Sequence, residues 1–208
     1  LADIQSDVYE FKLAARRAVS AGYKVIEIHA AHGYLIHQFL SPLVNLRADD
    51  YGESFVNRIR FLVEIVFAVK EELGKEQSLW VRLSATDWAE GGWDLEQTIE
   101  LVKILKLQGV EVADISSGGA VSYQQIPIEP GYQVPFADEI KNSTEICTGT
   151  VGLITSAKQA KDIINRAAAD FVLIGREFLR DPHLVYEWAK ELGEDINWPP
   201  QYERAKIE

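Results

Sequence analysis

Short runs of β-branched residues alternate with amphipathic helical patterns along nearly the whole of this 208-residue chain. A strand that is buried on both faces reads as such a run, whereas a helix places its apolar residues three and four positions apart. Strands that alternate with helices form a parallel sheet with right-handed crossovers, because parallel neighbours need a long connection between them. The alternation therefore predicts an α/β fold.

The pattern places five strands at residues 24–28, 79–83, 110–115, 145–148 and 171–174. Helical patterns cover residues 8–21, 55–73, 95–105, 135–141 and 175–190, with one more starting after residue 156. Ser54, Asp94 and Ser156 stand where a side chain can accept hydrogen bonds from a helix N-terminus, and Ser156 with Gln159 forms a capping box. We expect one domain over residues 1–208, with residues 197–208 as an extended C-terminal arm.

Five parallel strands are compatible with two architectures. A flavodoxin-like or Rossmann sheet can use five strands, but no G-x-G-x-x-G fingerprint follows the first strand. A complete (β/α)₈ TIM barrel has eight strands and takes about 250 residues. The chain also contains no methionine and begins close to a helix rather than a strand. We therefore expect strands 4 to 8 of a (β/α)₈ barrel, with the first three strands missing.

Composition restricts the classes of partner. The formal net charge of −11 argues against a nucleic-acid surface, which needs clustered positive charge. No apolar run reaches the roughly 18 residues of a membrane span, and no basic segment followed by an apolar run suggests a signal peptide. The single cysteine, Cys147, cannot form an internal disulfide, which suits a reducing cytoplasm.

His29, His32 and Tyr34 stand at the end of the first expected strand, where side chains of a parallel barrel face its catalytic mouth. Two imidazoles and a phenol can donate hydrogen bonds to a carbonyl oxygen and deliver a proton nearby. The alternatives are a zinc pair and histidines that satisfy backbone groups. His-x-x-His alone does not separate these readings, although no helical His-Glu-x-x-His pattern supports a metal, and we expect none.

Arg82 ends the second expected strand within an otherwise apolar run. A guanidinium is costly to bury unless an anion or a carboxylate pairs with it. An electron-rich cofactor ring or a phosphate is one candidate partner, and a structural salt bridge is the other.

Glycines follow the last two expected strands, in the segment 148–152 and at Gly175, which precedes Arg176. Glycine lets backbone N–H groups approach a phosphate, and helix N-termini favour negative charge. Barrel enzymes bind phosphate on the loops after strands 7 and 8. The two consecutive glycine turns therefore predict an anion site, although such turns also occur for structural reasons alone.

The chain resembles the old yellow enzyme family of FMN-dependent ene-reductases, especially its bacterial NADPH dehydrogenase branch. The motifs that carry the resemblance are His29-x-x-His32-Gly33-Tyr34-Leu35, Gln38-Phe39-Leu40-Ser41-Pro42, Asn45-x-Arg47-x-Asp49-x-Tyr51-Gly52 and Ser54-x-x-Asn57-Arg58-x-Arg60-Phe61. Further matches run through Val81-Arg82, Ser116-Ser117-Gly118, Thr148-Gly149, Ile174-Gly175-Arg176 and Arg180-Asp181-Pro182 to Gln201-Tyr202-x-Arg204. The family's second glycine in its Tyr-Gly-Gly-Ser stretch is Glu53 here, and Cys147 cannot be assigned the family's redox-tuning cysteine role.

The resemblance implies an FMN-dependent NAD(P)H oxidoreductase, homo-oligomeric when intact, that reduces the C=C bonds of α,β-unsaturated carbonyl compounds such as enones and enals. His29 and His32 would hold the carbonyl oxygen, with Tyr34 beside it as a proton donor. Arg82 would contact the flavin ring near its N1–C2 edge. The remaining implied residues are Gly149, Thr150, Gly175 and Arg176 at the FMN phosphate, and Arg204 at a neighbouring subunit's site. The alternative function is a partial barrel that folds or oligomerises without flavin.

Overall fold

The structure is a computed structural model and describes residues 2–206. Within these residues, five parallel strands form one sheet: β1 (Val25–Ala30), β2 (Ser78–Ser84), β3 (Val112–Ser116), β4 (Cys147–Thr150) and β5 (Phe171–Val172). Each strand pairs with the next one in the chain, so the order is β1-β2-β3-β4-β5. A doubly wound sheet reverses its strand order at a switch point, and this sheet does not. The order is that of a barrel wall.

Helices precede, connect and follow the strands. They are α1 (Ala2–Ser20), α2 (Leu35–Leu40), α3 (Phe55–Lys70), α4 (Leu95–Leu107), α5 (Val134–Thr144), α6 (Ala157–Asn165), α7 (Arg176–Arg180), α8 (Leu184–Leu192) and the 3-10 helix η1 (Pro200–Ala205). The side chains of Ser54, Asp94 and Ser156 each accept a hydrogen bond from the backbone N–H three residues later. The three predicted N-caps are therefore confirmed.

The structure shows three local features that the sequence did not indicate. The short helix α2 was not expected, because six residues are too few to show a helical period. Residues 175–190 form two helices, since Pro182 disfavours helical geometry at Asp181, which is extended with φ −136° and ψ 100°. The expected extended arm contains η1, which starts at Pro200 because proline presets a helical φ. The last two residues of that arm lie outside the described part of the chain.

The two faces of the sheet differ in chemistry. On β2, Leu79, Val81 and Leu83 are buried in the core that the sheet forms with its helices. The alternate residues point to the other face, where Arg82 lies between His29 of β1 and Asp114 of β3 in register. The face of the sheet that carries no helices is therefore the polar one. His29, Arg82 and Asp114 lie on it, toward the carboxyl ends of their strands.

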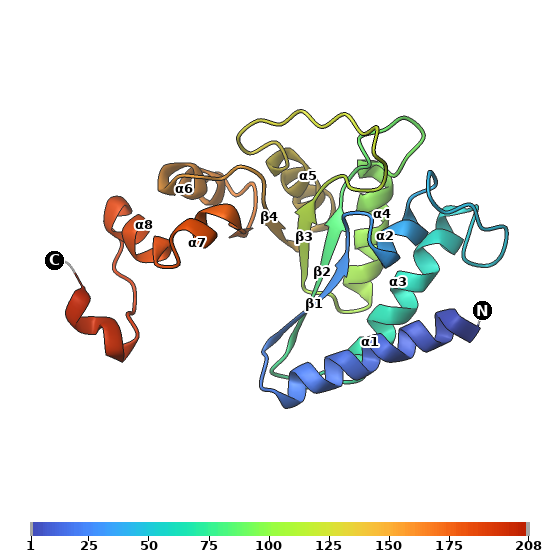
Figure 1. The fold of residues 1–208 in the computed structure, drawn as a ribbon, viewed down its shortest axis with the longest axis horizontal. Helices are drawn as coiled ribbons and strands as arrows, with labels where there is room; N and C mark the ends of the chain where they lie inside the picture. Colours follow the sequence, from blue (N-terminus) through green and yellow to red (C-terminus); the bar gives the residue numbers. More distant parts are fainter. Residues whose placement is uncertain (1, 207–208) are drawn as a thin grey trace.

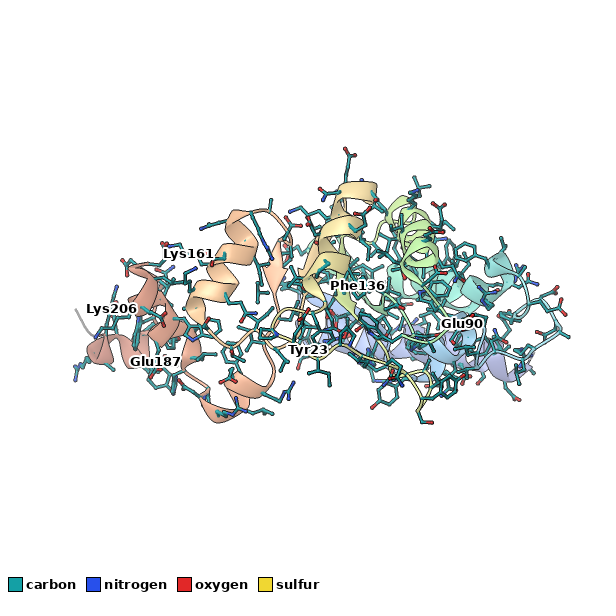
Figure 2. All side chains as sticks on the ribbon, turned by 90° about the horizontal axis from the view of Figure 1, so that it is seen from above. Tyr23, Glu90, Phe136, Lys161, Glu187 and Lys206 are labelled. Carbon is teal, nitrogen blue, oxygen red and sulfur yellow. The ribbon has the colours of Figure 1, made fainter. Side chains whose placement is uncertain are left out.

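Packing thins toward the C-terminus. Figure 1 shows α1, α3 and α4 grouped beside β1 and β2, whereas α6, α7 and α8 extend the molecule away from them. From above, Lys161, Glu187 and Lys206 lie at one end and Glu90 at the other (Figure 2). α7 has no buried residue, while α3 has eight. In the described part of the chain, no helix is both long and apolar enough to span a membrane.

Candidate active site

The predicted histidine cluster forms at the carboxyl end of β1. The ring centroid of His29 lies 5.3 Å from that of His32 and 5.2 Å from that of Tyr34. His29 is also the register partner of Arg82 on β2. The structure therefore brings His29, His32, Tyr34 and Arg82 together at the ends of adjacent strands, which is the convergence that the sequence predicts.

Residues 31–34, which we call the histidine turn, adopt an unusual backbone. His32 and Gly33 both have positive φ values, of 58° and 75°. The N–H of His32 donates to Ser84 Oγ at 3.0 Å. A Cβ on Gly33 would lie 2.1 Å from the carbonyl oxygen of Gly119, so glycine is required where the loop after β3 packs against the turn.

Both histidines of the cluster favour the neutral form. Burial first and the positive charge of Arg82 second lower the pKa of His32 to about 4. The same two causes, with partial burial first, lower the pKa of His29. His32 Nε2 also lies 2.6 Å from Ser116 Oγ, which fixes its ring. Each neutral imidazole keeps one N–H donor and one acceptor nitrogen.

Arg82 meets a carboxylate, as one of the two sequence readings proposed. Its Nη1 lies 3.1 Å from Oδ2 of Asp114, which is fully buried. The contact is an ion pair whose angles are not those of a hydrogen bond, and Arg82 Nε has no partner among the described residues. Burial raises the pKa of Asp114, and Arg82 opposes that rise. The guanidinium is thus paired with Asp114 through Nη1, and its side chain keeps 24% exposure.

A cavity of about 340 Å³ opens beside this arginine, between the loops that follow β4 and β5, and we call it the β4–β5 cavity. Its lining consists of Arg82, Ser116, Tyr132, Gln133, Val151, Gly152, Leu153, Ile154, Thr155, Leu173, Ile174, Gly175, Arg176, Glu177 and Arg180. Arg176 and Arg180 bring positive charge to its rim, and Gly175 begins the turn into α7. The arrangement suits an anion.

Gly149 and Thr150, the first half of the expected phosphate site, do not line this cavity. Both lie inside β4, fully buried and paired with β3 and β5, so their backbone groups belong to the sheet. A Cβ on Gly149 would lie 2.6 Å from Leu173, which explains the glycine by packing. β4 continues beyond its predicted end, so the turn after it begins later, and Gly152, with φ 126°, is the glycine of that turn which lines the cavity. The role of Gly149 and Thr150 at a phosphate stays a prediction.

Arg204 does not join the cluster. It is exposed on η1, the last element before the C-terminus, which lies at the far end of the molecule from β1 (Figure 1). Its role at a neighbouring subunit's site stays a prediction.

Gln133, which the sequence did not single out, helps to organise the site. Gln133 donates from Nε2 to the carbonyl oxygen of Val151, and its Oε1 accepts from the hydroxyl of Ser117 and lies 3.2 Å from Ser116 Oγ. Because Ser116 also contacts His32, Gln133 joins the histidine turn to the β4–β5 cavity. No sequence signal marks this link, since its parts lie on separate loops. Within residues 2–206, no group of three or more His, Cys, Asp or Glu side chains is placed to hold a metal ion.

Comparison with known proteins places this geometry in context. The family described as NADH:flavin oxidoreductase / NADH oxidase matches residues 1–195. The NADPH dehydrogenase of Listeria monocytogenes serotype 4b (strain CLIP80459) is 52% identical over 202 residues, which are 97% of this chain and 59% of that protein. The NADPH dehydrogenase of Geobacillus thermodenitrificans (strain NG80-2) is 50% identical over 204 residues, 98% of this chain and again 59% of the relative. The chain thus spans 59% of the length of these curated relatives.

Solved structures share the fold. A 2-naphthoyl-CoA reductase in complex with 2-naphthoyl-CoA has a TM-score of 0.83 at 28% identity, covering 92% of this chain and 29% of that one. Morphinone reductase in complex with tetrahydroNAD has a TM-score of 0.74 at 28% identity, covering 97% of this chain and 52% of that one. With the sequential strand order, this likeness confirms the prediction of a partial (β/α)₈ barrel.

Proposed function

The chain belongs to the NADH:flavin oxidoreductase / NADH oxidase family, and we propose that the protein which carries it is an FMN-dependent NAD(P)H oxidoreductase that reduces the C=C bonds of α,β-unsaturated carbonyl compounds. One observation carries the proposal. A cluster of neutral hydrogen-bond donors lies at the carboxyl end of β1, a cavity with a cationic rim lies at the carboxyl ends of β4 and β5, and Arg82 of β2 borders both.

The residues of the β4–β5 cavity fit the phosphate end of FMN. Gly152 and Gly175 allow close approach to the backbone, and Arg176 supplies a charge-assisted donor. The guanidinium of Arg82, which lines the same cavity and keeps 24% of its side chain exposed, would donate to the electron-rich edge of the flavin ring. The chemistry that FMN supplies when bound is hydride transfer, from NAD(P)H to the carbon–carbon double bond.

The histidine turn would bind the substrate. His29 and His32 would donate their N–H groups to the carbonyl oxygen, which draws electron density away from the β-carbon and makes it electrophilic. The low pKa of His32 keeps its imidazole neutral. Its single N–H would lie on Nδ1 and be available to the carbonyl oxygen when the Ser116 hydroxyl donates to Nε2. Tyr34, whose side chain is exposed at the mouth, would deliver the proton to the α-carbon. The substrate class is therefore an enone or an enal.

The test is NADPH-dependent reduction of a simple cyclic enone by the FMN-loaded protein. The expected product is the saturated ketone, with no attack on the carbonyl group. His29→Ala and His32→Ala should each lower kcat about 100-fold, the usual cost of removing one donor to a developing oxyanion. His183→Ala, which changes an exposed histidine on the far side of the molecule, is the matched control.

Two results would contradict the proposal. One is NADPH consumption without loss of the alkene, and the other is unchanged enone reduction in both histidine variants. A parallel assay on residues 1–208 alone should be at least about 100-fold slower than the protein that carries them, because an open sheet holds reacting atoms less closely.

A further inference from the structure

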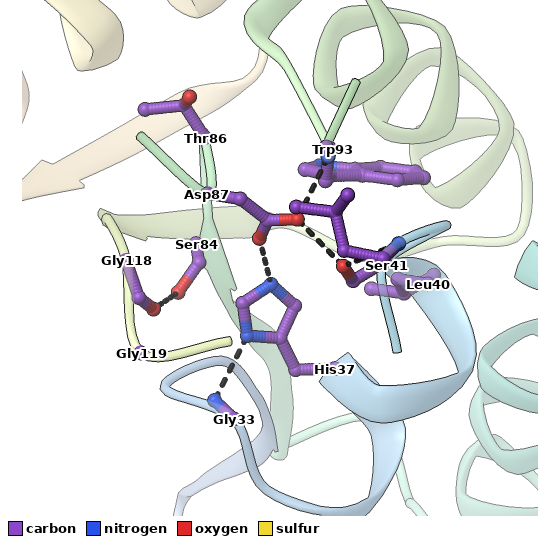
Figure 3. Close-up of polar contacts among 12 residues, drawn as sticks. Gly33, His37, Leu40, Ser41, Ser84, Thr86, Asp87, Trp93, Gly118 and Gly119 are labelled. Carbon is purple, nitrogen blue, oxygen red and sulfur yellow. Dashed lines mark hydrogen bonds and ion pairs between the residues drawn. The ribbon is translucent and has the colours of Figure 1, made fainter. Parts of the chain in front are cut away.

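A fully buried polar network lies behind the histidine turn and is not used by the proposed chemistry. His37 of α2 and Asp87, which follows β2, both have 0% exposure. His37 Nε2 lies 2.9 Å from Asp87 Oδ1, and the N–H of Gly33 donates to His37 Nδ1 at 2.9 Å (Figure 3). The imidazole thus stands between a carboxylate and the backbone of the turn.

The hydrogen bonds fix the protonation of this pair. Because Nδ1 accepts from Gly33, the ring proton must lie on Nε2 and point to Asp87. The other carboxylate oxygen accepts from the hydroxyl of Ser41 at 2.6 Å and from the N–H of Trp93 at 2.8 Å. Burial raises the pKa of Asp87, but the hydrogen bonds from His37, Ser41 and Trp93 outweigh it and hold the pKa below its ordinary value. Asp87 therefore acts as an ionised acceptor for three donors.

The turn that receives this support is strained. His32 is a non-glycine residue in left-handed geometry, and Gly33 follows in the same region. The backbone N–H of His32 is taken by Ser84 and that of Gly33 by His37, so both peptides are fixed by side chains. Ser84 Oγ in turn donates to the carbonyl oxygen of Gly118 (Figure 3). The spacing between His32 and Tyr34, which flank Gly33, depends on these contacts.

We infer that His37, oriented by Asp87, is a positioning residue that holds the Gly33 peptide and thereby sets where His32 and Tyr34 meet the substrate oxygen. This inference rests on the proposed function for its catalytic consequence, but its structural half stands on the contacts alone. A residue that merely stabilised α2 would need no partner outside the helix, and His37 reaches both the turn before α2 and the loop after β2.

A matched pair of variants isolates the contact to Gly33. His37→Asn places an amide oxygen near the position of Nδ1 and keeps an acceptor for the Gly33 N–H. His37→Leu has nearly the same shape and has no acceptor. Both variants lose the hydrogen bond to Asp87, so the difference between them is the hydrogen bond from the Gly33 N–H. Thr98→Val is the control, because it removes a buried hydroxyl that accepts from Trp93 Nε1 and does not touch the turn.

The experiment uses the FMN-loaded protein that carries this chain and measures two quantities. Amide hydrogen exchange over residues 29–36 should rise in His37→Leu and stay near wild type in His37→Asn and Thr98→Val. The kcat for enone reduction should fall in His37→Leu at least about tenfold below that of His37→Asn, because a displacement of about 1 Å can cost about 100-fold. Equal exchange and equal kcat in the two His37 variants would overturn the inference.

A measurement on the unmutated protein covers the case in which these variants do not fold. ¹⁵N spectra of the His37 ring should show a protonated Nε2 and a bare Nδ1, and a proton on Nδ1 would overturn the inference. If the wild-type protein does not reduce enones, the proposed function fails. The exchange and tautomer measurements still decide whether His37 holds the turn.

Discussion

The β1–β2 end of the site and its β4–β5 end are built in different ways. At the first, His37 and Asp87 are fully buried, and the histidine turn is tied down by side chains from two other segments. At the second, β4 and β5 have four and two residues, α7 has no buried residue, and Arg176 is exposed. The β1–β2 end is organised before any ligand binds. The β4–β5 end offers positive charge and glycine turns that a bound anion would order.

The contrast extends to electrostatics. The first end works with the neutral imidazoles of exposed His29 and half-buried His32, and a neutral donor is little influenced by salt. The second end works with exposed arginines, whose attraction for an anion is screened by salt. Three measurements test whether the two ends differ in this way.

The largest effect is expected from Asp87→Ala. The change leaves the Nε2–H of His37, the hydroxyl of Ser41 and the N–H of Trp93 without a partner in a buried site. Because each unmade buried hydrogen bond costs about 1–3 kcal/mol, the free energy of unfolding should fall by at least about 3 kcal/mol in urea denaturation. The counterpart at the C-terminal end is Asp181→Ala, which removes an exposed acceptor of the His183 N–H and should cost at most about 1 kcal/mol. Equal losses would erase the contrast in rigidity.

An intermediate effect is expected from Arg176→Ala. The measured quantity is the Kd for FMN, obtained from the quenching of flavin fluorescence. Loss of one charge-assisted hydrogen bond of about 1.5–3 kcal/mol should raise the Kd roughly 10- to 100-fold. Added salt should weaken FMN binding to the unmodified protein more than binding to the variant. Arg17→Ala, on the exposed side of α1, is the control of equal charge change. An unchanged Kd in Arg176→Ala would remove the β4–β5 cavity from the flavin site.

The smallest effect is expected from pH at the first end. The pKa of His32 is lowered from 6.5 to about 4, so the fold favours the neutral ring. The stability that this contributes is present above pH 6.5 and is lost as the pH falls toward 4. NMR titration of His32 should give a midpoint near 4. FMN affinity, in contrast, should drop as the pH falls through about 6, where a phosphate loses its second negative charge. A His32 midpoint near 6.5 would show that the turn is not buried as described.

The sequence predicted features that are local or that depend only on where strands end. The caps at Ser54, Asp94 and Ser156 depend on a few neighbouring residues, and the convergence of His29 with Arg82 is expected once two parallel strands are placed. The family resemblance supplied the chemical roles. None of these needs knowledge of how distant loops pack.

The features that could not be predicted depend on such packing. His37 and Asp87 are 50 positions apart, and nothing in either local pattern indicates that one faces the other. Asp114, the partner of Arg82, reads from sequence as one polar residue in an apolar strand. The turn after β4 begins later than predicted because strand ends are set by pairing with neighbours, which local composition does not encode.

The unbroken strand order also bears on how such a chain reaches its fold during synthesis. Because every strand pairs with the one made just before it, each new βα unit finds its docking edge already present when it emerges from the ribosome. The loops to be closed are then single crossovers rather than excursions across the sheet, which keeps the entropic cost of each addition small. Growth by one unit at a time also leaves a bare strand edge at the advancing end, and this edge is the surface that a chaperone would have to shield until the next unit arrives.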